Sequence, residues 1–278
     1  MDLSLLKQKL DGLQQKPQSG GQKTDYTKIF WRPSVGKQQI RIVPSAYDSK
    51  NPFKELKFYY GITNKVMISP LNFGEKDPIY LFAQKLREEY NKENYVLAKK
   101  LDAKTRIFAP VIVRGEEDKG VRLWQFGKQV YEELLALAVD EEIGDYTDVA
   151  GGRDLTVETV GPESTGTPYN KSSVRVRLKT SALSEDSSTV ETWLKEQPNP
   201  EELFKRYTFD EMKIALEKWL SPEDAAEEGE IISEPAESFD DKPASNFSLD
   251  TSKAKQSKTD EFDNLFEDKK DKVDDLPF

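Results

Sequence analysis

Basic and aromatic residues alternate along residues 121–127, Val-Arg-Leu-Trp-Gln-Phe-Gly. In an extended strand, successive side chains point to opposite faces, so Arg122, Trp124 and Phe126 would share one face. Cations of this kind hold phosphates, and flat rings stack on unpaired bases at about 1–3 kcal/mol each without regard to sequence. Duplex DNA hides the faces of its bases. The segment therefore predicts a surface that binds single-stranded nucleic acid.

Further stretches of the chain repeat this mixture of cations and rings. Their candidate residues are Tyr90, Tyr95, Lys99, Lys100, Arg106, Phe108, Lys128, Arg175 and Arg177. Together with the first segment they would form a groove in which cations follow the phosphates and rings hold the bases. The alternative is that Phe108, Trp124 and Phe126 are core residues, because a shift of one residue exchanges the two faces of a strand.

Most catalytic chemistries are excluded by composition, since the 278 residues include no cysteine and no histidine. Disulfides, thiolate or imidazole metal sites, and nucleophiles built on Cys or a Ser/His pair cannot form. Residues 161–166 have the glycine spacing of a phosphate loop, but Thr167-Pro168 stands where Lys-Ser/Thr is required. The acidic run 140–142 could hold magnesium for a nuclease, yet such runs are usually solvated faces. We expect neither catalytic residues nor a cofactor.

The net charge of −10 is unevenly distributed along the chain. Residues 28–130 hold 20 Lys/Arg against 11 Asp/Glu, residues 131–220 hold 10 against 19, and residues 221–278 hold 7 against 18. A basic middle predicts an anionic ligand, whereas acidic blocks predict tails or surfaces that face partners.

Short strands should position the candidate residues. Apolar patterns typical of strands occur at 38–44, 53–60, 106–114, 121–126, 155–160 and 174–179, and a helical pattern follows Lys128. This combination predicts a mainly β fold with some α, namely an OB-type Greek-key barrel, with a β-sandwich as the alternative. Residues 187–220 return to helical spacing and predict two helices that close the domain.

Both ends of the chain differ from this middle part. Leu3, Leu6, Leu10 and Leu13 form one apolar stripe, which predicts a short helical arm that docks either on its own core or on a neighbouring subunit. Beyond residue 220 periodicity and apolar content are lost, so we expect disorder. The chain ends in Asp274, Asp275, Leu276, Pro277 and Phe278. An aromatic residue behind an acidic leader predicts a tip that binds a partner protein.

The sequence contains no stretch of the roughly 20 apolar residues that a membrane span requires. Its start, Met-Asp-Leu-Ser-Leu-Leu-Lys, lacks the basic and then apolar pattern of a signal peptide. We therefore expect a cytoplasmic protein that does not bind membranes.

Several motifs, taken in order, resemble one known family. They are Gln-Gln-Ile-Arg-Ile-Val-Pro-Ser (38–45), Asp-Pro-Ile-Tyr (77–80), Asn-Lys-Glu-Asn-Tyr (91–95), Arg-Leu-Trp-Gln-Phe-Gly-Lys (122–128) and Gly-Gly-Arg-Asp-Leu (151–155). Their order from about Trp31 to Leu220 is similar to that in the gene 32 family, the single-stranded DNA-binding, helix-destabilising proteins of T-even-type tailed phages. The resemblance implies an OB fold with an adjoining lobe and a DNA cleft between the two. It places Tyr95, Lys99, Lys100, Phe108 and Trp124 in the cleft, with Tyr90 and Tyr169 as further members.

The chain departs from the family's pattern at two places. The family's lobe is held by zinc on one histidine and three cysteines, and the matching positions here are Tyr60, Leu71, Asp77 and Tyr80. We expect the zinc site to be lost and packing to replace it. The family's basic block near the N-terminus, which drives cooperative binding, is replaced by the mostly apolar residues 3–9.

The resemblance also implies a function and an organisation. The protein would coat single-stranded DNA in the infected host cell during phage replication, recombination and repair. It would assemble with itself along DNA, and its tail would recruit the phage DNA polymerase, helicase loader and recombination mediator. The expected parts are an arm (1–27), a barrel core with its lobe (28–184, lobe 58–90), packing helices (185–220) and an acidic tail (221–278). The alternatives are an acidic-tailed scaffold protein that binds no nucleic acid and, less favoured, a nuclease.

Overall fold

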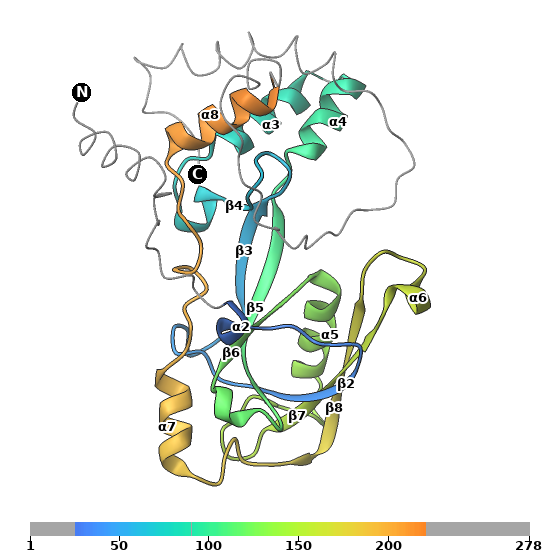
Figure 1. Ribbon diagram of the computed structural model, residues 1–278, viewed down its shortest axis with the longest axis vertical. Helices are drawn as coiled ribbons and strands as arrows, with labels where there is room; N and C mark the ends of the chain where they lie inside the picture. The colour runs from blue at the N-terminus through green and yellow to red at the C-terminus, as the bar shows by residue number, and fades with distance from the viewer. Residues whose placement is uncertain (1–25, 90, 221–278) are drawn as a thin grey trace, which may run out of the picture.

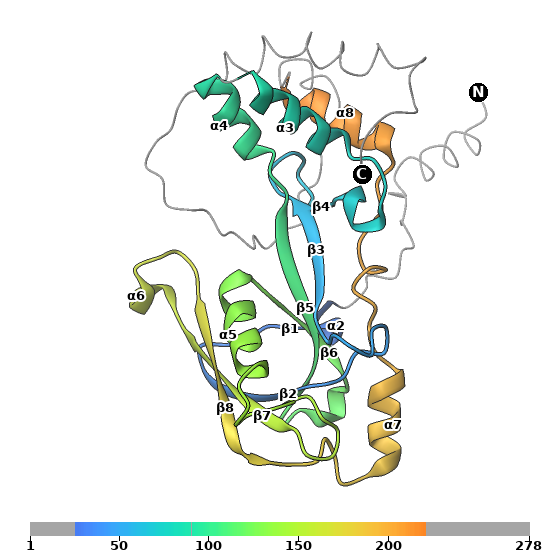
Figure 2. The same ribbon diagram turned by 180° about the vertical axis from the view of Figure 1, so that it is seen from behind.

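A computed structural model of the protein describes residues 26–89 and 91–220. These residues form a β-barrel and a helical lobe, which a long pair of strands connects (Figure 1). The view from behind shows the same division, with the barrel below and the lobe above (Figure 2). The expectations about Tyr90, about residues 221–278 and about all but the last two residues of the arm (1–27) lie outside the described residues.

Five strands form the barrel in the order of an OB fold. They are β2 (Gly36–Ile42), β5 (Lys104–Val113), β6 (Arg122–Phe126), β7 (Arg153–Val160) and β8 (Lys171–Thr180). β2 pairs antiparallel with β5 and β7, β5 also pairs with β6, and β7 also pairs with β8. Helix α5 (Lys128–Ala138) lies between β6 and β7 in the sequence and packs against β5 and β8. This Greek-key arrangement confirms the predicted barrel.

The barrel core consists mainly of alternate residues of these strands, together with Trp31 from the segment that enters the barrel. It contains Trp31, Ile40, Ile42, Ile107, Ala109, Val111, Trp124, Leu155 and Val157. Branched and aromatic side chains with a period of two pack well on a pleated surface, which explains why these segments are strands. The chain enters through α2 (Tyr26–Ile29) and β1 (Phe30–Trp31), and β1 pairs parallel with β6. Two short elements lie in hairpin turns, η2 (Glu117–Lys119) and α6 (Pro162–Thr165).

The lobe is built on the same long strand as the barrel. The first half of β5 pairs with β3 (Lys54–Tyr59), and its second half pairs with β2. β4 (Met67–Ile68), η1 (Pro70–Phe73), α3 (Pro78–Glu88) and α4 (Lys92–Lys100) follow β3. The lobe core contains Tyr59, Met67, Ile79, Phe82, Leu86, Leu97, Met212 and Leu216. The lobe therefore includes residues well outside the range 58–90.

The two helices of residues 185–220 pack on different parts of the molecule. α7 (Ser187–Lys195) lies outside the barrel, where Trp193 packs with Ile112 and Leu183. α8 (Phe209–Leu220) lies on the lobe and contributes to its core. Residues 196–208 run from the barrel to the lobe, so this segment is a second connection beside β3 and β5 (Figure 1). In the described ranges, no helix has the length and apolar composition needed to cross a membrane.

Candidate nucleic-acid interface

Two of the predicted stacking rings point into the barrel. Trp124 and Phe126 have exposed fractions of 1% and 6%, and their ring centroids are 4.6 Å apart. Trp31 lies 5.5 Å from Trp124 in an edge-on arrangement. The prediction that these rings stack on bases is wrong for this structure, because the face chosen for cations and rings is the core face of β6. The alternative, in which Trp124 and Phe126 are core residues, is correct.

Phe108 faces away from the barrel core, but other parts of the chain cover it completely. Its ring centroid lies 5.8 Å from that of Phe204, 6.1 Å from that of Phe58 and 6.3 Å from that of Phe30. Phe204 belongs to the segment that runs from α7 to α8. The expectation of an exposed Phe108 is therefore wrong, because alternation gives the direction of a side chain but not what covers it.

Arg122 is also buried, with an exposed fraction of 5%. Its Nη2 donates a hydrogen bond to Glu116 Oε2 at 2.6 Å, across the turn between β5 and β6. Hydrogen bonds from Arg122 and Lys119 hold the pKa of Glu116 below its usual value. Arg122 thus stabilises a hairpin turn, and the prediction that it contacts phosphates is not met in this conformation.

Helix α4 presents the exposed ring that the sequence predicts at Tyr95. The tyrosine side chain is 51% exposed, and Lys99 Nζ lies 5.4 Å from the centre of its ring. Lys100 is exposed on the same helix. The N-cap residue Asn91 accepts a hydrogen bond from Glu93 N at 2.9 Å, and the opposite side of the helix is buried in the lobe. We call Tyr95, Lys99 and Lys100 the α4 surface.

A second group of rings and cations lies toward the lobe end of the β3–β5 pair. We call it the waist surface, and it contains Tyr60, Phe73, Lys104, Arg106 and Arg206. The centre of the Tyr60 ring lies 5.5 Å from Arg106 Cζ and 5.9 Å from Lys104 Nζ. Arg206 Cζ lies 3.7 Å from the centre of the Phe73 ring. Both rings are partly buried and pack on one buried aromatic cluster, so a rigid core holds them beside their cations.

Of these five residues, only Arg106 is predicted from the sequence to bind DNA, and the structure leaves just 6% of it exposed. The signal that could have identified Arg206 is the stretch 204–207, Phe-Lys-Arg-Tyr, in which two rings flank two cations. That stretch lies in a range with helical spacing, yet the structure shows it as the connection before α8. The other cation of this stretch, Lys205, lies 4.7 Å from the Tyr207 ring and 2.8 Å from Glu211 Oε1, which neutralises it.

The remaining candidates lie on the barrel. Arg175 is 4.0 Å from Glu158, Arg177 is 2.6 Å from Gln39, and Lys128 is 3.2 Å from Glu132. All three cations are exposed, while Tyr169 is half-buried beside α6. In Figures 1 and 2, α4 and the β7–β8 hairpin with α6 project to the same side of the molecule. These cations are therefore accessible, but the acidic partners of Arg175 and Lys128 reduce their local positive charge.

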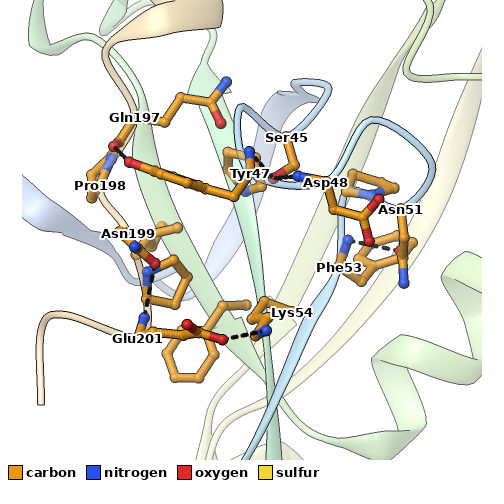
Figure 3. Close-up of a pocket in the computed structure, with 15 residues that line it drawn as sticks. Ser45, Tyr47, Asp48, Asn51, Phe53, Lys54, Gln197, Pro198, Asn199 and Glu201 are labelled. Atoms are coloured by element: carbon orange, nitrogen blue, oxygen red, sulfur yellow. Dashed lines mark hydrogen bonds and ion pairs between the residues drawn. The ribbon is translucent and has the colours of Figure 1, made fainter. Parts of the chain in front are cut away.

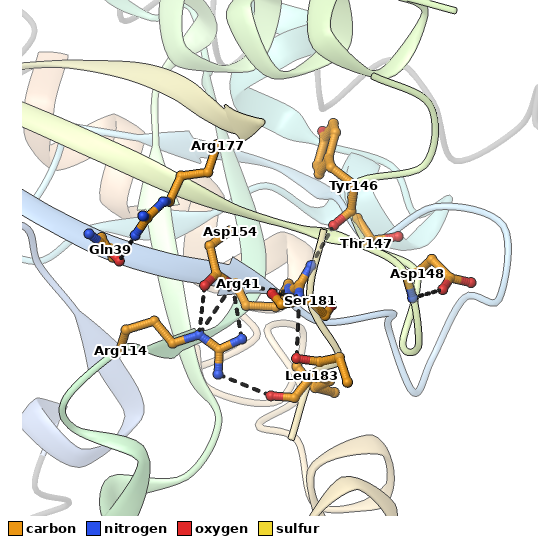
Figure 4. Close-up of polar contacts among 12 residues, drawn as sticks. Gln39, Arg41, Arg114, Tyr146, Thr147, Asp148, Asp154, Arg177, Ser181 and Leu183 are labelled. Atoms are coloured by element: carbon orange, nitrogen blue, oxygen red, sulfur yellow. Dashed lines mark hydrogen bonds and ion pairs between the residues drawn. The ribbon is translucent and has the colours of Figure 1, made fainter. Parts of the chain in front are cut away.

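Arg41, from the first family-like motif, belongs to a buried polar network and not to the surface (Figure 4). Its Nη2 donates to Ser181 Oγ at 2.8 Å, and its Nε lies 3.2 Å from Asp154 Oδ1. Arg114 donates to the same carboxylate at 2.9 Å and to the Leu183 carbonyl at 3.0 Å. Burial lowers the pKa of Arg41, and the Asp154 carboxylate opposes this shift. The network fastens the end of β8 to β2 and β7.

Gly152, from the last family-like motif, lies beside this network. A Cβ atom at this position would lie 2.3 Å from the Asp148 carbonyl oxygen and 2.6 Å from Arg41 Nη1. Since real Cβ atoms do not approach so closely, only glycine fits here. Gly152 thus allows the Arg41 side chain and residues 146–148 to pack closely in the barrel.

The positions that match zinc ligands do not fit a metal. Leu71 offers no donor atom, and both carboxylate oxygens of Asp77 are engaged by the protein. Asp77 Oδ1 accepts from the backbone nitrogens of Ile79 and Tyr80, and Oδ2 accepts from Tyr59 Oη at 2.8 Å and Ser69 Oγ at 2.5 Å. Burial and the Asp77 charge raise the pKa of Tyr59. In the part of the chain that the structure describes, no three Asp, Glu, His or Cys side chains cluster to hold a metal.

Comparison with known families agrees with this geometry. The family described as gp32 DNA binding protein like matches residues 34–221, which is more than half of the chain and spans both the barrel and the lobe. Comparison with curated protein sequences gave no significant match. The OB-type barrel, the adjoining lobe and the family match lead to one conclusion. The chain belongs to the gene 32-type family of single-stranded DNA-binding proteins.

Proposed function

We propose that this protein coats single-stranded DNA during phage replication, recombination and repair, in the cytoplasm of the infected cell and without catalytic turnover. The observation that carries the proposal is the exposed ring of Tyr95, with Lys99 beside it and Lys100 on the same helix. A base can stack on such a ring while the ammonium groups neutralise the adjacent phosphates. The waist surface supplies a second set of rings beside cations.

Binding of this kind opens duplexes without a source of energy. A ligand that binds only the open strand shifts the equilibrium between paired and unpaired DNA by mass action. The Tyr95 ring of the α4 surface can stack only on bases that are not stacked in a helix. Coating and helix destabilisation therefore follow from the same contacts.

The acidic tail supplies regulation in this proposal. Residues 221–278 hold 18 Asp/Glu against 7 Lys/Arg, and the region 28–130 has an excess of Lys/Arg. The tail would compete with DNA for the cationic surfaces, most strongly at low salt. DNA that displaces the tail would free the tip to recruit polymerase, helicase loader or recombination mediator.

A titration of fluorescent oligo-dT of increasing length at two salt concentrations tests the DNA-binding proposal. We expect tight binding whose logarithm falls steeply with the logarithm of salt concentration, at about 0.7 for each phosphate contact. Absence of binding at low salt would favour the scaffold protein instead. Cleavage of the labelled strand with magnesium would favour a nuclease.

The tail proposal has a separate test. Truncation after Leu220 should tighten binding of oligo-dT, with the largest gain at low salt. Deletion of residues 274–278 alone should leave DNA affinity unchanged and abolish recruitment of the partner proteins. Equal affinities of the full and truncated chains across a salt series would contradict competition by the tail.

A further inference from the structure

The lobe is joined to the barrel by two connections, and the first is the ribbon formed by β3 and β5. Along β5, residues 104–106 pair with β3, and residues 109–111 pair with β6. Phe108 lies at the junction, because its partners are Lys54 of β3 on one side and Gln125 of β6 on the other. A pair of strands needs further packing to be stable. The ribbon therefore requires a second support if the lobe is to keep one orientation on the barrel.

The second connection is residues 196–208, which we call the strap, and its start is fastened to the barrel (Figure 3). The side chain of Gln197 is buried, donates to the Pro44 carbonyl at 2.9 Å and accepts from Ala46 N at 2.9 Å. Tyr47 Oη donates to the Gln197 carbonyl at 2.6 Å. Figure 3 shows the Tyr47 ring extending toward the strap. These contacts hold the strap to the loop that follows β2.

The middle of the strap packs on the ribbon at its junction with the barrel. The ring centroid of Phe204 lies 4.8 Å from that of Phe58, 5.8 Å from that of Phe108 and 6.4 Å from that of Phe30. These separations are in the range in which aromatic rings attract each other. The three neighbours belong to β3, β5 and β1. One ring of the strap thus contacts both strands of the ribbon and the segment that enters the barrel.

The far end of the strap is fastened to the lobe. Arg206 Cζ lies 3.7 Å from the centre of the Phe73 ring in η1, and the strap continues into α8, which is part of the lobe core. The strap lies on the face of the ribbon opposite the lobe core, since Phe58 packs with Phe204 whereas its neighbour Tyr59 packs with the lobe helices. In Figures 1 and 2 the strap and α4 lie on opposite sides of the ribbon. The ribbon is therefore supported on both faces.

We propose that Phe204 is a positioning residue for single-strand binding, because it fixes the orientation of the lobe on the barrel. The inference rests on the proposed DNA-binding function. The α4 surface belongs to the lobe, whereas Arg175 and Arg177 belong to the barrel. A strand that contacts both gains affinity when their separation is fixed, because binding at one surface then holds the strand close to the other. Release of the strap would leave each surface intact and remove this gain.

The orientation of the lobe can be measured without DNA. The chain contains no cysteine, so Glu88→Cys in α3 and Asp118→Cys in the turn between β5 and β6 place one spin label on the lobe and one on the barrel. Both positions are exposed. Pulsed EPR should give a narrow distribution of label distances with native Phe204 and a broader one with Phe204→Ala. Phe204→Leu retains an apolar side chain and should broaden it less. An unchanged distribution in Phe204→Ala would overturn the proposal.

Leu194→Ala is the matched control. Leu194 is partly buried in α7 and packs with the cluster of Val43 and Ile112 on the barrel, so its truncation removes packing without loosening the lobe. The distance distribution should stay narrow in this variant. If circular dichroism shows that Phe204→Ala does not fold, Gln197→Ala replaces it, because it releases the barrel end of the strap and leaves the aromatic cluster in place. The same broadening is expected, and a narrow distribution would overturn the proposal.

Oligo-dT binding gives the second readout. Strands of about 4 and about 16 nucleotides span the site sizes known for one OB fold. Phe204→Ala should weaken binding of the long strand about tenfold, and binding of the short strand by less than about twofold, because only the long strand can link two surfaces. Leu194→Ala should change neither affinity.

Equal losses for both lengths would overturn the proposal, because a ring that contacts bases directly or supports the whole fold would weaken both alike. Absence of binding by the native protein at either length would overturn the positioning role together with the DNA-binding function. The EPR distances would then still show separately whether Phe204 holds the lobe. The two failures are therefore distinguishable.

Discussion

The barrel and the lobe both place aromatic rings near cations, but they use these rings differently. In the barrel, strands such as β6 are covered on both faces. Trp124 and Phe126 therefore fill the core, and Arg122 forms a hydrogen bond to Glu116 across the turn between β5 and β6. In the lobe, α4 buries one side and leaves the other in solvent with Tyr95. The same residue types therefore stabilise the fold in one region and remain available to a ligand in the other. Mutations should separate the two uses.

The largest expected effect is on the stability of the barrel. Trp124→Ala removes a ring that packs between Trp31 and Phe126, and it should lower the free energy of unfolding by about 3–5 kcal/mol. Denaturant unfolding gives this value, and oligo-dT affinity of the folded fraction should change by less than twofold. Trp124→Phe retains much of the packed volume and should cost less. A selective loss of DNA affinity with normal stability would show that Trp124 does contact bases.

The next effect concerns the polar contacts that hold the lobe. Asp77→Ala leaves the hydroxyls of Tyr59 and Ser69 without their buried acceptor and removes the N-cap of α3, at a cost of about 2–4 kcal/mol in unfolding. Thermal melting should show this loss. A chelator should change neither Tm nor DNA affinity of the native protein. Stoichiometric zinc in elemental analysis of the purified protein would contradict this account.

A smaller effect, on binding alone, is expected at the α4 surface. Tyr95→Ala should weaken oligo-dT binding by about 1–3 kcal/mol through lost base stacking, and Tm should not change because the side chain is 51% exposed. Tyr80→Ala is the matched control, since it removes an exposed tyrosine from the neighbouring helix. Quenching of tyrosine fluorescence by poly-dT provides an additional readout. Equal affinities of both variants and the native protein would remove Tyr95 from the interface.

The sequence predicted the barrel well and the binding surface only in part, for one physical reason. Alternation within a strand, as in β2 and β6, depends on neighbouring residues, so it can be read locally. Which face is covered depends on distant segments: Phe204, almost 100 residues after Phe108, covers that ring. Tyr95 was identified from the cations near it in the sequence and from the family resemblance, and its ring is exposed because α4 buries only one side. The waist surface combines residues from four separate segments, and no local pattern could have revealed their proximity.

The smallest change in binding is expected at the waist surface, toward the lobe end of the β3–β5 pair. Arg206 is exposed and its guanidinium lies on Phe73, whereas the adjacent Lys205 is neutralised by Glu211. If the waist surface binds DNA, Arg206→Ala should weaken binding by about 1 kcal/mol and reduce the salt slope by about 0.7, the value for one phosphate contact. Lys205→Ala should change the slope less, because its charge is already compensated. The experiment is a salt series of oligo-dT titrations on both variants, and equal slopes for the two would confine the interface to α4.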